Sequence, residues 1–321
     1  MPRFCIVIPC FNNERTIAEA IDTALAQEHD DFMVVVGDNG SQDRSQAIID
    51  GYDDPRLIKL LNLPTLGKTD NWNRAYNAAP DCQYLVTLHG DDRLASSALR
   101  SIAEQADCGL PPLIHGRVNL IDDDGRFLRT VGLPLDYVAT ASEFRRIQMV
   151  SNVVGIAGMA MRTDLFARLG GWSSEWTSSQ DVEIWWQLVQ FGPARHTKAV
   201  LGDYRVFANQ IGKAVVIENS RWARLHMAEY PEDSVEYRAG RDALAEFRRA
   251  LESRDDFAEG TADIDLDALL GPSEPAPKGF RHPHFRQRLY RMTLAARTAL
   301  SADRKRGRGA FASVPFQGLR S

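Results

Sequence analysis

The chain has 321 residues, of which 44% are hydrophobic and 25% charged, and its formal net charge is −5. This composition excludes a disordered chain as the default and favours a globular protein with one large core and an appendage. The longest apolar runs have the length of strands, and no charged leader precedes the first of them, so we expect neither a signal peptide nor a membrane span.

Strands and helices alternate over the first 90 residues. Continuous apolar runs predict buried strands at 4–9, 32–37, 56–61 and 84–88, and helical spacing or capping residues predict helices within 14–27, 40–52 and 69–79. Asn13 is available as the N-cap of the first helix. The alternation predicts parallel βαβ units, in which the carboxyl ends of the strands lie at one edge of the sheet, where ligands usually bind.

The pattern becomes less regular beyond Asp92. Residues 113–131 predict a hairpin that turns at Asp124 and Gly125. The elements expected after it are a helix at 140–150, a strand and helix within 155–172 that end at Gly170 and Gly171, and a capped helix within 178–192. Such irregular parts of a domain commonly adapt it to a particular substrate.

We expect the main domain to span residues 1–220 and a helical extension to span 221–321. A Pro-rich linker occupies 271–280. The tail from 281 to 321 carries ten Lys and Arg against one acid, which gives +9, whereas residues 1–280 carry −14. The tail is therefore a separate electrostatic unit, and its Gly/Arg-rich end predicts disorder.

Polar and aromatic residues follow each of the four predicted strands and should meet at one rim of the sheet. They are Pro9, Phe11 and Asn12 after the first strand, Asp38 and Asn39 after the second, Gly67 and Lys68 after the third, and Asp91 and Asp92 after the fourth. An aromatic ring, a hydrogen-bond acceptor, a lysine and a carboxylate pair together suit a nucleoside diphosphate with a divalent cation.

In these segments the chain resembles the family 2 glycosyltransferases, inverting enzymes with the Rossmann-like GT-A fold. The resemblance is carried, in the family's order, by VIPCFNNERTIAEAIDTALAQ, VVVGDNGSQDRS, NLPTLGKTDNWNRAYNAA, YLVTLHGDDRL, GMAMRTDLFARLGGW and SSQDVEIWWQL. It covers about the first two thirds of the chain. It implies an α/β fold with a mostly parallel sheet flanked by helices, here followed by the helical C-terminal extension.

The resemblance also implies roles for individual residues. Asp91 and Asp92 would hold Mg²⁺ or Mn²⁺ against the donor's diphosphate, and Asp91 would also contact the nucleotide sugar. Pro9, Phe11, Asn12, Asp38 and Lys68 would bind the nucleotide sugar, with Phe11 stacking on the base, Asp38 accepting from the base or ribose and Lys68 near the diphosphate. Asp181 would be the general base, and Glu183 is its substitute if Asp181 points away.

Four positions depart from the family's pattern. His89 stands where many members have the first aspartate of D-x-D, Asn39 replaces a second acid, Gln180 replaces the acid beside the base, and Phe207 stands where histidine is common. His89 can bind metal or only fill space. These departures motivate a rival hypothesis, a GT-A-like nucleotide- or protein-binding module that does not transfer sugar.

Two other nucleotide-binding folds fit poorly. A P-loop requires glycine at position 62, where the chain has Asn62, and Pro64 further reduces the N–H groups that the loop can offer to phosphates. A dinucleotide fold requires glycines in the first strand-to-helix turn, which has none.

The sequence therefore predicts an inverting glycosyltransferase of polysaccharide or glycoconjugate synthesis, with a UDP-sugar as donor and a saccharide or lipid-linked acceptor. Arg162, Trp172, Trp176 and Trp185 can line a saccharide site, although aromatic residues at such spacings usually belong to the core. The four cysteines lack metal-ligand spacing and predict reduced thiols in a cytoplasmic protein. Residues 281–308 can contact an anionic membrane surface at the inner face or dock on acidic protein, and nucleic acid is not expected as a partner.

Overall fold

A computed structural model of the protein describes residues 2–61, 64–150, 154–207 and 213–253. The predicted linker at 271–280 and the basic tail at 281–321 lie outside the described residues. In the described part of the chain, no helix has the length and apolar composition needed to cross a membrane.

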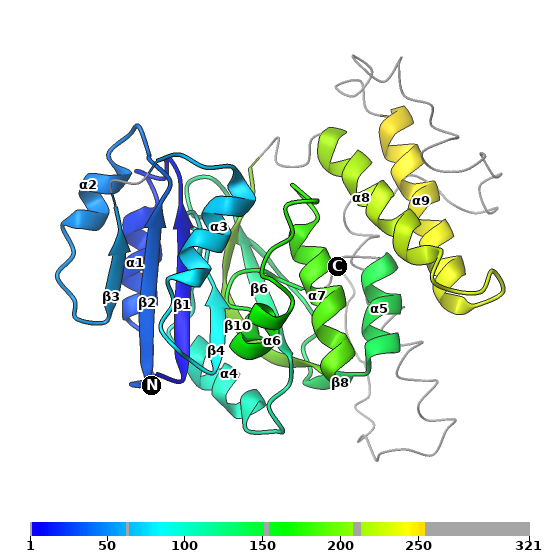
Figure 1. Ribbon diagram of the computed structural model, residues 1–321, viewed down its shortest axis with the longest axis horizontal. Coiled ribbons are helices and arrows are strands. Elements are labelled where there is room, and N and C mark those ends of the chain that lie inside the picture. Colours follow the sequence, from blue (N-terminus) through cyan, green and yellow to red (C-terminus); the bar gives the residue numbers. More distant parts are fainter. Residues whose placement is uncertain (1, 62–63, 151–153, 208–212, 254–321) are drawn as a thin grey trace. The chain divides into compact units, whose positions relative to one another are not determined.

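A ten-stranded mixed sheet forms the centre of the fold (Figure 1). The strands are β1 (Phe4–Cys10), β2 (Phe32–Asp38), β3 (Leu57–Leu60), β4 (Tyr84–Thr87), β5 (Arg93–Leu94), β6 (Leu113–Ile121), β7 (Phe127–Val131), β8 (Tyr137–Ala139), β9 (Ala160–Arg162) and β10 (Ala194–Arg205). Their order is β3-β2-β1-β4-β9-β6-β10-β5, with β7 paired to β6 and β8 paired to β10. The neighbours β3, β2, β1 and β4 are parallel, as are β6 and β10, so the predicted α/β class with a largely parallel sheet is confirmed.

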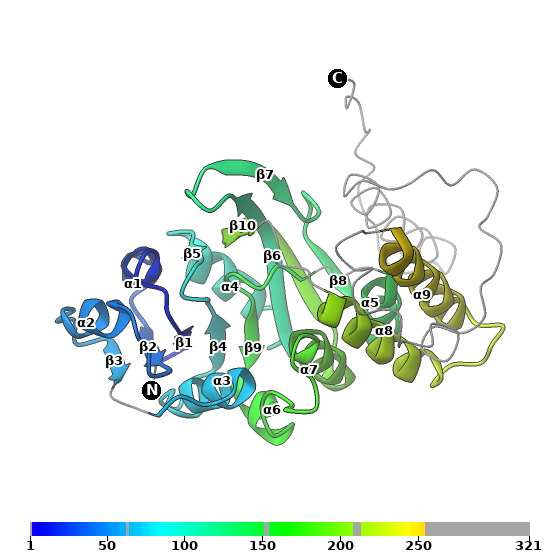
Figure 2. The same ribbon diagram turned by 90° about the horizontal axis from the view of Figure 1, so that it is seen from above.

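The described helices are α1 (Ile17–Leu25), α2 (Ser45–Asp50), α3 (Lys68–Asn77), α4 (Ala98–Ala106), α5 (Ala141–Val150), α6 (Thr163–Arg168), α7 (Gln180–Leu188), the 3₁₀ turn η1 (Val189–Phe191), α8 (Lys213–Met227) and α9 (Val235–Ser253). Helices cover both faces of the sheet, and Figure 2 shows α1 and α3 on opposite sides of it. The alternation of side chains along β1 explains this arrangement. Phe4, Ile6 and Ile8 pack in the core with α1, whereas Cys5 and Val7 pack in the core with α3.

Local signals placed most of the early elements correctly. The hairpin of β6 and β7 turns where expected, with Gly125 at φ 79°, and the glycine stop after α6 has Gly170 and Gly171 at φ 83° and 81°. The predicted N-cap of α1 is wrong, because Thr16 takes that position. The Asn13 side chain instead accepts a hydrogen bond from the Phe11 amide and closes the turn after β1.

The extension packs on the domain through α8 and α9. A core of its own joins these helices to α5 and α7 and includes Met149, Trp186 and Trp222. Ser220, where we placed the end of the main domain, lies inside α8 and is fully buried. The division of the chain at residue 220 stays a prediction, and helix α8 runs across it.

Candidate active site

The loops that follow β1, β2 and β4 are joined by hydrogen bonds at one edge of the sheet. The Asn12 amide donates to Ser41 Oγ over 2.9 Å, and Thr16 Oγ1 donates to the Gly90 carbonyl oxygen over 2.8 Å. Because these strands are parallel neighbours, their carboxyl ends lie together. The topology therefore places the residues predicted from separate loops around one rim.

Three of the predicted nucleotide-binding residues follow β1 or lie at its end. Pro9 is buried within the strand opposite Gly37. Phe11 has 47% of its surface exposed, so its ring is available for stacking, and Asn12 adopts a left-handed backbone with φ 53°. The exposed ring of Phe11 is consistent with a stacking role, which stays a prediction.

Asp38 is fully buried at the end of β2. Its Oδ2 accepts hydrogen bonds from the amides of Gly40 and Ser41, and its Oδ1 accepts one from Ser41 Oγ over 2.5 Å. This is the geometry of an Asx turn, in which a carboxylate organises the loop that follows it. The predicted contact with a base or ribose remains untested, and in this conformation Asp38 holds the loop.

His89, Asp91 and Asp92 form the acidic cluster after β4, and one potential ligand atom from each lies within 4.8 Å of the others. Within the described part of the chain, Asp92 Oδ2 and His89 Nε2 are buried without a hydrogen-bond partner. Burial and then the neighbouring Asp91 charge raise the pKa of Asp92 well above its usual value, and burial lowers the pKa of His89 to about 4. A neutral imidazole and two carboxylates form a donor set that fits a divalent cation such as Mn²⁺.

Arg205, at the end of β10, holds this cluster in place and has only 3% of its surface exposed. Its backbone amide donates to Asp92 Oδ1 and its Nε donates to the Asp91 carbonyl oxygen, each over 2.8 Å. Its remaining guanidinium nitrogens bind the carbonyl oxygens of Asp122 and Asp123 and the carboxylate of Glu19. Sequence reasoning missed Arg205, since a lone arginine at a strand end does not show which groups it will meet.

Asp181 lies in the first turn of α7 and is partly buried. Burial raises its pKa from 3.8 to about 6, against the opposing effects of the Val182 amide and the nearby Lys68 ammonium. A carboxylate with a pKa just below neutrality suits a general base. It is mostly ionised at neutral pH, and it binds a proton more strongly than an ordinary aspartate does. The predicted role of Asp181 as the base remains a prediction.

Lys68 and Trp72 on α3 connect the acidic cluster to Asp181. Lys68 acts electrostatically on both His89 and Asp181, and its Nζ lies 4.8 Å from the centre of the Trp72 ring. The ring of Trp72 in turn packs against His89, with 4.9 Å between their centres. Lys68 was predicted to lie near a diphosphate, whereas Trp72 was missed because an aromatic residue on a helix usually indicates the core.

Glu183 is held by other side chains. Its carboxylate accepts hydrogen bonds from Gln187 Nε2, Trp222 Nε1 and His226 Nε2, each over 2.8 Å. Burial would raise the pKa of Glu183, but these hydrogen bonds outweigh it and lower the pKa. Glu183 is therefore a poor substitute for Asp181 as a base.

Asn39 and Gln180, which replace acidic residues of the family's pattern, have different surroundings. The Asn39 side chain donates to and accepts from the backbone of Leu66, so it joins the loop after β2 to the segment before α3. Gln180 is 1% exposed, and its side-chain amide has no hydrogen-bond partner among the described residues. Asn39 therefore has a structural role, whereas the unsatisfied amide of Gln180 has no explanation in the protein alone.

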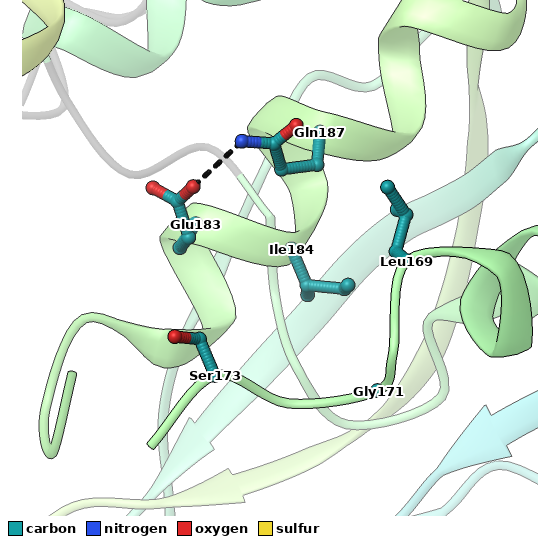
Figure 3. A pocket seen from close by; sticks show the side chains of 6 residues that line it. All are labelled: Leu169, Gly171, Ser173, Glu183, Ile184 and Gln187. Atoms are coloured by element: carbon teal, nitrogen blue, oxygen red, sulfur yellow. Dashed lines mark hydrogen bonds between the residues drawn. The ribbon is translucent and has the colours of Figure 1, made fainter. Parts of the chain in front are cut away.

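A pocket of about 310 Å³ lies beside α7 and is lined by Leu169, Gly171, Ser173, Glu183, Ile184 and Gln187 (Figure 3). Glu183 and Gln187 are one helical turn apart and project from a different side of α7 than Asp181. The pocket therefore lies on a different side of α7 from Asp181. The predicted saccharide-site residues Trp172, Trp176 and Trp185 are at most 3% exposed and belong to the core.

The largely parallel sheet flanked by helices is that of a GT-A-type fold. The chain belongs to the family described as "Glycosyl transferase family 2", whose sequence model matches residues 5–169. Among solved structures, S. aureus TarS 1-349 in complex with UDP-GlcNAc has a TM-score of 0.61 and 16% identity, covering 97% of this chain and 94% of that one. At this identity the likeness establishes the fold.

Two curated relatives match shorter parts of the chain at higher identity. The succinoglycan biosynthesis protein ExoO of Rhizobium meliloti (strain 1021) is 30% identical over 129 residues, which are 40% of this chain and 37% of that protein. A GalNAc(5)-diNAcBac-PP-undecaprenol beta-1,3-glucosyltransferase of Campylobacter jejuni subsp. jejuni serotype O:2 is 28% identical over 112 residues, which are 34% and 36% of the two chains. The matched regions span little more than a third of the length of these relatives.

Proposed function

We propose that the protein is an inverting glycosyltransferase that moves a sugar from a nucleoside diphosphate donor to a hydroxyl group of a saccharide or lipid-linked acceptor. The observation that carries this proposal is that Lys68 links the cluster of His89, Asp91 and Asp92 to the segment before Asp181. Its Nζ lies over the Trp72 ring, which packs against His89, and it donates to the Thr177 carbonyl oxygen. Family membership and the fold support the same reaction class.

In the proposed reaction Asp181 accepts the proton of the acceptor hydroxyl, whose oxygen then bonds to the anomeric carbon. The bond between that carbon and the phosphate oxygen breaks, and the departing nucleoside diphosphate takes the electron pair. A divalent cation held by Asp91, Asp92 and His89 would supply positive charge to the diphosphate. Lys68 adds a second positive charge near the same position, and one displacement with no covalent sugar intermediate inverts the anomeric centre.

The donor that we propose is a UDP-sugar, and the acceptor belongs to polysaccharide or glycoconjugate synthesis. The solved complex of TarS with UDP-GlcNAc supports a uridine nucleotide, and the two curated relatives support a saccharide or undecaprenol-linked acceptor. An acceptor of this kind would place the enzyme at the cytoplasmic face of the membrane. The basic segment 281–308, which we expect to contact that membrane, lies outside the described residues.

The test incubates the full chain with a panel of nucleotide sugars and Mn²⁺ and follows release of nucleoside diphosphate. We expect slow donor hydrolysis that Asp91→Asn and Asp181→Asn both reduce. Nucleotide binding without turnover under all conditions would favour the rival function, a binding module without transferase activity. That rival is motivated by the replacements His89, Asn39 and Gln180 at positions where the family has acids.

A further inference from the structure

Helix α8, which follows the region matched by the family, binds α7 along one face. Glu218, Trp222 and His226 recur at intervals of four residues and therefore share a side of α8. Trp222 and His226 both donate to Glu183, which lies in the first turn of α7 but on a different side from Asp181. Glu218 binds the segment that leads into α7, so the contact begins beside the first turn of the helix that carries Asp181.

Glu218 binds the backbone of the segment that directly precedes α7. Its Oε1 accepts hydrogen bonds from the backbone amides of Ser178 and Ser179, the latter over 2.7 Å, and its Oε2 accepts one from Thr177 Oγ1 over 2.6 Å. Ser179 is the N-cap residue but forms no side-chain cap, because its Oγ donates to Asn219 Oδ1 over 2.8 Å. A carboxylate at this end of the helix also interacts favourably with the helix dipole.

The same short segment is held from its other side by α3. Lys68 Nζ donates to the Thr177 carbonyl oxygen over 3.3 Å, and Thr69 Oγ1 donates to the Trp176 carbonyl oxygen over 3.5 Å. Residues 176–179 therefore lie between a lysine on α3 and a glutamate on α8. Since Asp181 comes two residues later, both contacts fix the backbone from which its side chain projects.

Lys68 and Glu218 also act on Asp181 through their charges. The Lys68 ammonium lowers the pKa of Asp181 and the Glu218 carboxylate raises it, while burial remains the main cause of the net increase. Burial would raise the pKa of Glu218 itself, but hydrogen bonds from Thr177, Ser178 and Ser179 outweigh it and lower the pKa. Glu218 is thus ionised across the pH range in which Asp181 titrates.

We propose that Glu218 is a positioning residue for the reaction: its carboxylate fixes the start of α7 and sets the orientation of Asp181. This inference rests on the proposed function, in which Asp181 is the base. It makes α8, the helix that crosses the predicted boundary at residue 220, a part of the active site, because the residue that orients the base comes from this helix.

The experiment compares Glu218→Gln and Glu218→Ala with Trp222→Phe in the full chain. Glutamine keeps the shape of the side chain and one acceptor oxygen but removes the charge, so it tests the role even if the alanine variant does not fold. Trp222→Phe is the matched control, since it removes a hydrogen bond between α8 and α7 at Glu183 and leaves the bonds of Glu218 to residues 177–179 in place. Hydrolysis of UDP-GlcNAc with Mn²⁺ is the kinetic probe.

We expect Glu218→Gln to lower kcat by about tenfold to a hundredfold, because a small misplacement of a catalytic group has effects of this size. The donor KM should stay within about twofold of the wild-type value. The acidic limb of the kcat profile should move to lower pH, since a negative charge next to Asp181 is lost. Trp222→Phe should lower the midpoint of thermal unfolding and leave the acidic limb in place.

A titration of ¹³C-labelled aspartate by NMR, with Asp181→Asn to assign the signal, measures the same coupling without turnover. If Glu218→Gln leaves both kcat and the Asp181 titration unchanged, or if Trp222→Phe moves the titration equally, the inference is overturned. Full activity of Asp181→Asn would instead reject the base assignment of the proposed function. The NMR titration would still decide whether Glu218 acts on Asp181.

Discussion

The backbone N–H of Arg205 donates a hydrogen bond to Asp92 Oδ1 over 2.8 Å, across 113 positions of the chain. The end of β10 therefore fixes the orientation of a buried carboxylate that follows β4. The Oδ1 atom of Asp92 is satisfied by this bond, while Oδ2 has no hydrogen-bond partner among the described residues and lies 3.9 Å from His89 Nδ1. This division lets one oxygen anchor the loop while the other remains free to bind a cation.

Replacing Arg205 with Met should destabilise the fold by about 3 kcal/mol, because the change removes the buried hydrogen bonds of the guanidinium group to three backbone carbonyl groups and to the Glu19 carboxylate. Urea unfolding followed by circular dichroism measures this free energy. The control is Arg44→Met, which removes an exposed pair with Glu14 and should cost less than about 0.5 kcal/mol. Equal effects of the two changes would show that Arg205 is not a structural anchor.

The acidic cluster should bind Mn²⁺ more tightly than Mg²⁺, because His89 adds an imidazole nitrogen to two carboxylates. Calorimetry with UDP and each ion should show this preference in the wild-type chain and a smaller one in His89→Asp. Asp92→Asn should weaken Mn²⁺ binding by about tenfold or more. Loss of a residue that only hydrogen-bonds to a metal ligand already costs about tenfold in affinity, and Asp92 is proposed to be a ligand itself. Asp124→Asn, at the exposed turn between β6 and β7, should change nothing. UDP affinity that does not respond to a chelator would contradict the metal site.

The rate of donor hydrolysis or transfer should fall as the pH decreases through about 6, because Asp181 must be ionised to accept a proton. An unperturbed aspartate would place this limb near 3.8. Asp181→Asn should remove the limb and lower kcat by about 10² to 10⁴. Glu183→Gln should instead reduce stability and keep the limb, since Glu183 is bound by Gln187, Trp222 and His226. The reverse pattern would assign the base to Glu183.

Two buried histidines should make the protein sensitive to acid. The ring centres of His115 and His196 lie 4.9 Å apart. Burial lowers the pKa of both side chains, and that of His196 falls from 6.5 to about 4. The unfolded chain therefore binds more protons than the folded one, so stability falls as the pH decreases from 6.5 toward 4. For His196 this amounts to about 3 kcal/mol.

The measurement that checks this compares urea unfolding at pH 7 and at pH 4.5 for the wild type and His196→Asn. Asparagine can still donate to the Leu135 carbonyl oxygen that His196 Nδ1 contacts. The variant should lose less stability between the two pH values than the wild type does. An identical loss would mean that other groups cause the acid sensitivity.

The N-terminal half of the fold could be predicted because its signals are local. Strands β1 and β2 are continuous apolar runs that are buried on both faces, and α1 has buried residues at helical spacing. Strand β10 was missed, since its residues mix charged and apolar types without alternation and its pairing with β6 is interrupted by two shifts of register. Pairing with β5, β6 and β8 makes it a strand, and those partners are distant in sequence.

The sequence by itself determined the α/β class, the rim of residues after the parallel strands and the family, because apolar periodicity and short motifs act over a few neighbouring residues. Only the tertiary structure decided that Arg205 holds Asp92, that Glu183 is bound to α8 and that Glu218 binds the segment before α7. The physical reason is that the energy of a buried charge depends on the partners that surround it. Those partners come from segments whose meeting no local pattern encodes.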